Sequence, residues 1–358
     1  MGVSDDDEPS HERHLASHIF NLAVMAVGGI ALYFMMRRLG WDHFREVMHD
    51  VGPWFGLIIG LESGALLCDA AALNTFMRPE ARMVSYWRVL AAQAGGRAIN
   101  TLTPGGTLGE VAKVSLLVSH APRDRVLSSI VLLNLANIYL SIIIIVIGTS
   151  ITLLLVPLPH SVKVVVAIGI AGIVPAGIAL VVLVHRGALT TVLKGARVAR
   201  LVKPDRLERW QNRLVAIDGH IRELHKNRTA GTWKGVLWVI ASKVINASNT
   251  VVMLHVTGVP LHASVVIGVL SIGILVAWVS AIVPMGLGLA DGGNYALYSA
   301  LGATGVNGVA MTLVSRTRTV IFALLGLVVM AVLHAVNRLG LAKMHRRLRA
   351  LRAQAEAR

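Results

Sequence analysis

Charged and amide side chains lie inside long apolar stretches of this sequence, where they could bind a polar ligand. Glu62 and Asp69 are seven residues apart, so a helix places both on one face. Lys243 precedes Asn246 by three residues, within one helical turn. Such side chains are costly in lipid, so they usually line a cavity or pair with one another. The full group is Glu62, Asp69, Lys243, Asn246, Arg316 and Arg318.

Two proline–glycine breaks, about 180 residues apart, interrupt other apolar stretches. An acid follows each break, Glu110 after the first and Asp291 after the second. Backbone at membrane depth must be covered by protein or water, so a broken helix implies a cavity. The free N–H groups at the start of a half-helix suit an anion such as phosphate. The residues that form the breaks are Pro104, Gly105, Gly106, Pro284, Gly286 and Gly288.

Motifs for nucleotide hydrolysis and for nucleophilic or metal-dependent catalysis do not occur. Residues 105–109 are rich in glycine, but no Gly-Lys-Ser/Thr follows them. The single cysteine, Cys68, can form neither an intramolecular disulfide nor a zinc cluster. His11, His14 and His18 are typical of a solvated helix face rather than of a metal site. We therefore expect no metal, no other cofactor and no enzymatic activity.

Long apolar runs identify the elements that must position these side chains. Of 358 residues, 55% are hydrophobic and 15% are charged, whereas soluble proteins carry about 25% charged residues. A helix of about 20 apolar residues crosses the bilayer. The sequence predicts six full spans, at residues 18–36, 53–73, 130–155, 162–184, 235–254 and 309–335.

The segments 89–119 and 263–303 are also apolar but contain the two breaks, so each predicts a re-entrant hairpin. One hairpin is entered from inside and the other from outside, which is the pattern of an inverted repeat. The expected fold is an all-α polytopic membrane protein. Its predicted parts are a polar tail 1–17, a transmembrane domain 18–336 whose first repeat is 18–155, a basic cytoplasmic segment 186–234 and a basic cytoplasmic tail 337–358.

The net charge of +15 is concentrated beside the predicted spans. Residues 186–234 hold twelve Lys/Arg against four acids, and residues 338–358 hold seven against one. Basic loops remain on the cytoplasmic side, so this distribution predicts that both termini are cytoplasmic. Because membrane topology explains the basic residues, we do not expect a nucleic-acid partner.

Both breaks lie in stretches that resemble a known family. The first is Arg97-Ala-Ile-Asn-Thr-Leu-Thr-Pro-Gly-Gly-Thr-Leu-Gly-Glu-Val-Ala-Lys113, and the second is Pro284-Met-Gly-Leu-Gly-Leu-Ala-Asp-Gly-Gly-Asn-Tyr-Ala-Leu. They resemble flippase-like membrane proteins related to the transmembrane region of lysylphosphatidylglycerol synthase, and most closely the hopanoid-associated branch. The resemblance covers about residues 15–335, and Met285 and Asp291 depart from the family's usual Gly and Glu.

The resemblance implies lipid movement between leaflets, or lipid handling linked to envelope synthesis. The synthase's catalytic domain has no counterpart in this sequence, so aminoacyl transfer is not expected. We expect a flippase or scramblase of the bacterial inner membrane, in which Glu110 and Asp291 orient the binding cations or take up protons. The residues expected to bind an anionic head group are Arg97, Asn100, Lys113, Arg316 and Arg318.

Other interpretations of the same residues stay open. The charges could form internal ion pairs, for example Arg316 with Asp291 or Glu62. The chain could be an accessory protein that binds a lipid or a lipid-synthesis enzyme without transport, or a lipid-modifying enzyme with Glu62, Asp69 or Glu110 as general base. The lipid could be a phospholipid, a hopanoid or a polyprenyl-linked carrier.

Overall fold

A computed structural model describes the chain over residues 49, 51–78, 84–103, 108–118, 120–156, 163–164, 166–172, 175, 230–280 and 288–356. The expected first span, most of the span 162–184 and all but the end of the basic segment 186–234 lie outside the described residues. So do five of the six break residues, Pro104, Gly105, Gly106, Pro284 and Gly286.

Helices account for nearly all of the described residues, and this part of the chain contains no strand. Proline precedes two of the helices, at Pro53 and Pro122, where its fixed φ and missing N–H are tolerated. The principal helices are α3 (Trp54–Met77), α4 (Tyr86–Leu102), α5 (Leu108–Leu117), α6 (Arg123–Leu155), α10 (Ala230–Val256), α11 (Ala263–Ser280), α12 (Leu289–Ala300) and α13 (Gly305–Glu356).

Five helices in the described part are long and apolar enough to cross a membrane. Four of them, α3, α6, α10 and the Gly305–Val332 part of α13, correspond to predicted spans. The fifth is α11, which we expected only as one arm of a broken hairpin. Its 18 residues make it long enough to span by itself, whereas α4 and α5 have 17 and 10 residues. The fold is therefore that of an all-α polytopic membrane protein.

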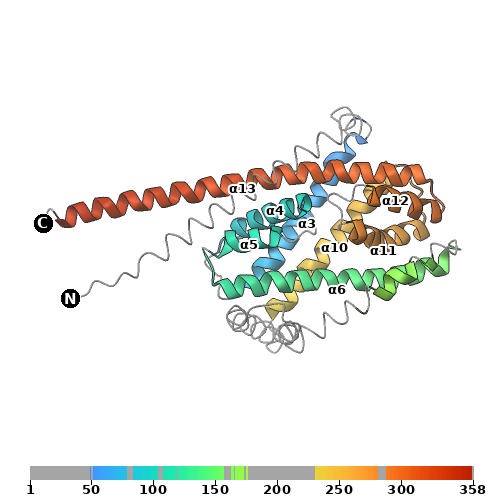
Figure 1. Cartoon of the computed structure of the whole chain (residues 1–358), viewed down its shortest axis with the longest axis horizontal. Helices are drawn as coiled ribbons and strands as arrows, with labels where there is room; N and C mark the ends of the chain where they lie inside the picture. The colour runs from blue at the N-terminus through green and yellow to red at the C-terminus, as the bar shows by residue number, and fades with distance from the viewer. Residues whose placement is uncertain are drawn as a thin grey trace, which may run out of the picture.

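The helices α4 and α5 lie at one end of the molecule, α11 and α12 lie at the other end, and α3 and α10 cross between them (Figure 1). The helices α13 and α6 lie along opposite edges, and α3 packs against α10 between them. At one end, α4 packs against α5 and α13. At the other end, α11 packs against α6, and α12 packs against α13. The α4–α5 hairpin and the α11–α12 pair thus occupy opposite ends of the long helices.

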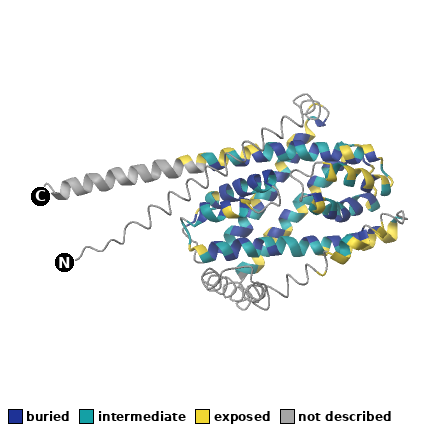
Figure 2. Ribbon diagram, viewed as in Figure 1, coloured by how far each residue is buried: buried dark blue, intermediate teal, exposed yellow. Residues whose placement is uncertain are grey.

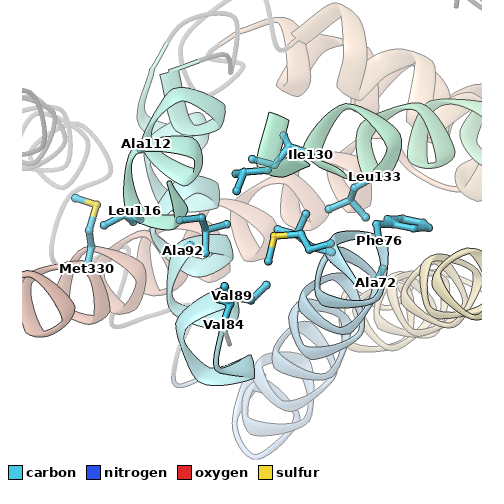
Figure 3. Packing of buried hydrophobic residues seen from close by; sticks show 14 of the residues in the cluster. Ala72, Phe76, Val84, Val89, Ala92, Ala112, Leu116, Ile130, Leu133 and Met330 are labelled. Atoms are coloured by element: carbon cyan, nitrogen blue, oxygen red, sulfur yellow. The ribbon is translucent and has the colours of Figure 1, made fainter. Parts of the chain in front are cut away.

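The long helices carry both buried and exposed residues (Figure 2), and large apolar side chains occur in both classes, as expected for a membrane protein. Ile147, Leu154 and Val328 are exposed on the outer faces of α6 and α13 although they are large and apolar, so a bilayer is their natural surroundings. Inside, Phe76, Val89, Leu116 and other apolar residues of α3–α6 form a core, and Met330 of α13 joins this core beside Leu116 (Figure 3). This core fixes α4 and α5 against the spans.

Glycine lets the two arms of the α4–α5 hairpin approach closely. A Cβ on Gly109 would collide with the carbonyl oxygen of Gly96 and with the Asn100 side chain. A Cβ on Gly96 would in turn lie 2.8 Å from the Gly109 carbonyl oxygen. Because two of these obstacles are backbone atoms, rotation of a side chain cannot relieve the overlap.

We expect Gly109→Val to destabilise the protein by about 1–3 kcal/mol or more, since it overpacks a close helix contact. Thermal unfolding of purified protein in detergent measures this loss. Gly60→Val is the matched control, because nothing lies within 4 Å of a Cβ at Gly60. Equal unfolding temperatures for the two variants would contradict this account of the hairpin.

Candidate functional site

Glu62 is the centre of a buried ion-pair cluster that joins four helices. Its Oε1 lies 2.7 Å from Arg97 Nη2 of α4, and its Oε2 lies 3.0 Å from Arg318 Nη1 of α13. Asn249 of α10 donates a hydrogen bond of 3.0 Å to the same Oε2. Glu62 is only 5% exposed. A buried carboxylate needs such partners, since an unpaired charge in this position is strongly unfavourable.

A cavity of about 620 Å³ opens beside this cluster, between α3, α4 and α13. The polar lining residues of the three helices gather around the Glu62 cluster, and most of the apolar lining residues lie further along the same helices. The polar lining residues are Glu62, Ser63, Arg97, Thr101, Arg318 and Thr319. The apolar lining residues include Leu66, Trp87, Leu90, Phe322, Leu325 and Val329. Among them, Trp87 and Leu325 are also exposed at the protein surface.

The charged end of the cavity has an excess of positive charge. The two arginines Arg97 and Arg318 both pair with the carboxylate of Glu62, so the charges of the three side chains sum to +1. Arg97 Nη1 is also buried without a hydrogen-bond partner. A buried donor without a partner carries a desolvation cost that an anionic ligand would relieve. The arrangement suits the phosphate of an amphiphile whose apolar part contacts the remaining walls.

A second polar group lies where α3, α10 and α6 meet. The carboxylate of Asp69 hydrogen-bonds with Ser242 and interacts electrostatically with Arg97 and Lys243. Lys243 Nζ donates a hydrogen bond of 2.9 Å to Ser141 Oγ. Arg97 therefore faces both acids of α3, as the seven-residue spacing of Glu62 and Asp69 predicted for one helix face.

The hairpin residues Asn100, Glu110 and Lys113 bind one another rather than the cavity. Asn100 Nδ2 donates to Glu110 Oε1 at 2.8 Å, and the Gly109 N–H donates to Asn100 Oδ1 at 2.7 Å. Lys113 Nζ pairs with Glu110 Oε1 at 2.9 Å and is 4% exposed. None of the three lines the cavity of Arg97 and Arg318. Their observed contacts hold α4 against α5 beside the first break.

Asp291 and Arg316 form a separate ion pair at the second break. Arg316 Nη2 lies 2.7 Å from Asp291 Oδ2, which also accepts a hydrogen bond of 3.1 Å from the Gly288 N–H. Gly288 has φ of 80°, a conformation that favours glycine at the start of α12. Arg316 borders a smaller cavity of about 170 Å³, and Thr319 lines both cavities. The two arginines of α13 thus face different cavities.

The structure shows that Asn246 and Asn249 of α10 have different hydrogen-bond partners. Asn246 donates to the Ser242 carbonyl oxygen of its own helix at 2.8 Å, so its observed bonds are local. Asn249, one turn later, is the residue that reaches Glu62. The sequence signal for Asn249 was its place on the same helix face. In the described residues, no three His, Cys, Asp or Glu side chains form a group that could hold a metal ion.

Comparison with protein families matches residues 21–353 to a model described as the lysylphosphatidylglycerol synthase TM region. The search of curated proteins gave no match, and neither did the search of solved structures. The family match covers most of the chain, and it includes every residue of the clusters described above. The chain therefore belongs to the family of the lysylphosphatidylglycerol synthase transmembrane region, a family of membrane proteins in lipid-related processes.

Proposed function

We propose that the protein is a flippase or scramblase that moves an anionic lipid between the leaflets of the bacterial inner membrane. The observation that carries this proposal is the cavity between α3, α4 and α13, which has a positively charged end and apolar walls. A head group with a phosphate would bind Arg97 and Arg318, because guanidinium groups bind two oxygens at once. The acyl or isoprenoid part would contact the apolar walls.

The order and packing of the helices support an inverted repeat, which is the architecture of many transporters. The segments α3–α6 and α10–α13 each contain a long helix, two shorter helices and a second long helix. The helix α4 packs against α13 of the other segment, and α11 correspondingly packs against α6 (Figure 1).

The basic segments support the orientation that we propose, with both termini in the cytoplasm. The lipid partner would be a phospholipid, a hopanoid bearing an anionic group or a polyprenyl phosphate, and a lipid-synthesis enzyme would act before or after transport. We propose no enzymatic activity for this chain. Of the three carboxylates that a lipid-modifying enzyme could use, those of Glu62 and Glu110 are bound to Arg97, Arg318 and Lys113. The third, that of Asp69, hydrogen-bonds with Ser242 and does not line the cavity.

A leaflet-exchange assay tests the proposal. Purified protein is placed in liposomes with fluorescent phosphatidylglycerol in both leaflets, and a membrane-impermeant quencher is added outside. We expect quenching beyond that of empty liposomes. Quenching equal to that of empty liposomes with phosphatidylglycerol and with a polyprenyl phosphate would favour a non-transporting accessory protein instead.

Arg316→Ala is expected to slow lipid movement about tenfold while the protein still folds and inserts. The guanidinium borders the smaller cavity next to the binding cavity, and a hydrogen bond to a charged group contributes roughly 1.5–3 kcal/mol. The same assay measures the rate. Val328→Ala is the matched control, since Val328 lies on the same helix and faces outward. Unchanged exchange in Arg316→Ala would remove Arg316 from the lipid path.

A further inference from the structure

Asp69 differs from Glu62 and Glu110 because it forms no salt bridge with any residue that the structure describes. Its Oδ1 is buried and has no hydrogen-bond partner, and its one hydrogen-bonding side chain is Ser242. Glu62, two turns earlier on α3, instead has partners on both oxygens. A buried carboxylate oxygen without a donor favours the neutral acid over the anion.

The cations that face Asp69 are each bound to another group. They come from three helices, Arg97 from α4, Lys113 from α5 and Lys243 from α10. Their other partners are Glu62 for Arg97 at 2.7 Å, Glu110 for Lys113 at 2.9 Å and Ser141 for Lys243 at 2.9 Å. Asp69 therefore interacts with them through space and does not hold them in place.

Three further ionisable side chains lie on α3 or contact its backbone: Cys68, Tyr86 and Arg125. Cys68 precedes Asp69 on α3 and feels its charge. Tyr86 of α4 donates its hydroxyl to the Leu67 carbonyl oxygen. Arg125 of α6 donates to the Met77 and Arg78 carbonyl oxygens, about two turns further along α3. These contacts leave Asp69 the acid of this group that can change its charge without breaking an ion pair.

We propose that Asp69 is a proton-binding site, and that a proton bound there strengthens the binding of an anionic lipid beside Arg97. This inference rests on the proposed function and adds a proton as the second ligand. The connection is Arg97, which interacts with Asp69 on one side and with Glu62 and the cavity on the other. Protonation of Asp69 removes one negative charge from the surroundings of Arg97.

The sign of the coupling follows from the charges. Arg97, Arg318, Lys243 and Lys113 against Glu62, Asp69 and Glu110 give four cations and three anions, a sum of +1. With Asp69 neutral, the sum is +2, so an anion binds more tightly. Coupling between two ligands is reciprocal, so the bound lipid also favours the bound proton. A lipid would therefore cross together with a proton, and a proton gradient would set the direction of net movement.

Binding of a short-chain phosphatidylglycerol to the purified full-length chain in maltoside micelles tests the coupling by calorimetry. As pH is lowered, we expect the wild-type affinity to rise, by up to about tenfold per pH unit for one linked proton. Asp69→Asn should bind with the high affinity of the acidic wild type at every pH. A pH-independent wild type, or the same pH dependence in Asp69→Asn, would overturn the proposal.

Ser242→Ala keeps the carboxylate and removes its hydroxyl partner. Since that hydroxyl stabilises the anion, the pH at which affinity changes should move upward in Ser242→Ala, with the affinities at both ends unchanged. A merely structural Asp69 would lower stability without moving this pH. The variant thus supplies a test even if Asp69→Asn does not fold.

Infrared spectroscopy separates this inference from the proposed function, because it needs no lipid. We expect wild-type protein to gain a protonated-carboxyl band as pH falls, and Asp69→Asn to lack this band. If the band appears but the protein binds no phosphatidylglycerol, the result supports the proton site and contradicts the lipid site. If the protein binds phosphatidylglycerol but the protonated-carboxyl band does not appear, the result supports the lipid site and overturns the proton site.

Discussion

Replacing Arg318 by Gln is expected to lower the movement of anionic lipid about tenfold to a hundredfold. Arg318 is largely buried, lies 3.0 Å from Glu62 and lines the charged end of the cavity. A charge-assisted hydrogen bond to a phosphate is worth roughly 1.5–3 kcal/mol, and each 1.4 kcal/mol corresponds to about a factor of ten. The rate comes from the leaflet-exchange assay with phosphatidylglycerol, and the folded fraction comes from size-exclusion chromatography.

A lower rate of lipid exchange in Arg318→Gln has a second explanation, because the substitution removes one of the ion-pair partners of Glu62. Breaking a buried ion pair from one side costs about 3–5 kcal/mol. The double variant Glu62→Gln/Arg318→Gln removes both charges and keeps the sum at the charged end equal to that of the wild type. If Arg318 binds the head group, the double variant stays slow. If recovery to wild-type rate occurs, Arg318 serves only to neutralise Glu62.

Arg88→Gln is the matched control for this series. Arg88 lies on α4 with Arg97 but does not line the cavity. It therefore tests whether loss of any arginine near this end of the protein slows exchange. A slow Arg88→Gln would show that the general positive charge of this end, rather than the paired arginines, determines the rate.

Hydropathy predicted α3, α6, α10 and the apolar part of α13, because burial in lipid requires about 20 apolar residues. It did not identify α11 as a span, because the second break was taken to interrupt that segment. Pro53 marked the start of α3 correctly. The beginning of α6 was placed at residue 130 although the helix starts at Arg123, because helical backbone continues through polar residues that hydropathy does not count. For the same reason α13 continues through the basic tail to Glu356.

The sequence shows which residues are charged, but it does not show which of them form ion pairs with one another. Arg316 was expected to meet either Asp291 or Glu62, and the structure pairs it with Asp291 while Arg318 takes Glu62. Two residues along a helix rotate a side chain by about 200°, so the two arginines face opposite sides. Which side faces which acid depends on the rotation of α13 against α3 and α12, and no local pattern encodes that rotation.

The first hairpin shows the same limit on a smaller scale. Arg97 and Lys113 were expected at one head group, but Lys113 binds Glu110 within α5 while Arg97 turns toward α3. A Glu–Lys pair three residues apart is a local contact that the sequence does reveal. What the sequence did not reveal is that Asn100 and Gly109 close the hairpin over this pair, because that contact depends on the approach of the two arms.

Glu62→Gln is expected to change binding and transport in opposite directions. The carboxylate occupies Arg97 and Arg318 in the empty cavity, with distances of 2.7 and 3.0 Å, so a lipid phosphate must compete with it. Removing its charge raises the sum at the charged end from +1 to +2. At an effective dielectric constant of about 20, a unit charge at about 4 Å contributes roughly 4 kcal/mol, so even a partial effect gives more than about tenfold tighter binding of phosphatidylglycerol.

Tighter binding should slow transport, because a lipid that remains on both arginines is not released to the other leaflet. We therefore expect Glu62→Gln to bind short-chain phosphatidylglycerol more tightly in calorimetry and to exchange it more slowly in liposomes. Its affinity should still depend on pH, since Asp69 is intact, and this separates it from Asp69→Asn. Weaker binding in a folded Glu62→Gln would mean that Glu62 positions the arginines for the lipid rather than competing with it, and would reverse the role assigned to this residue.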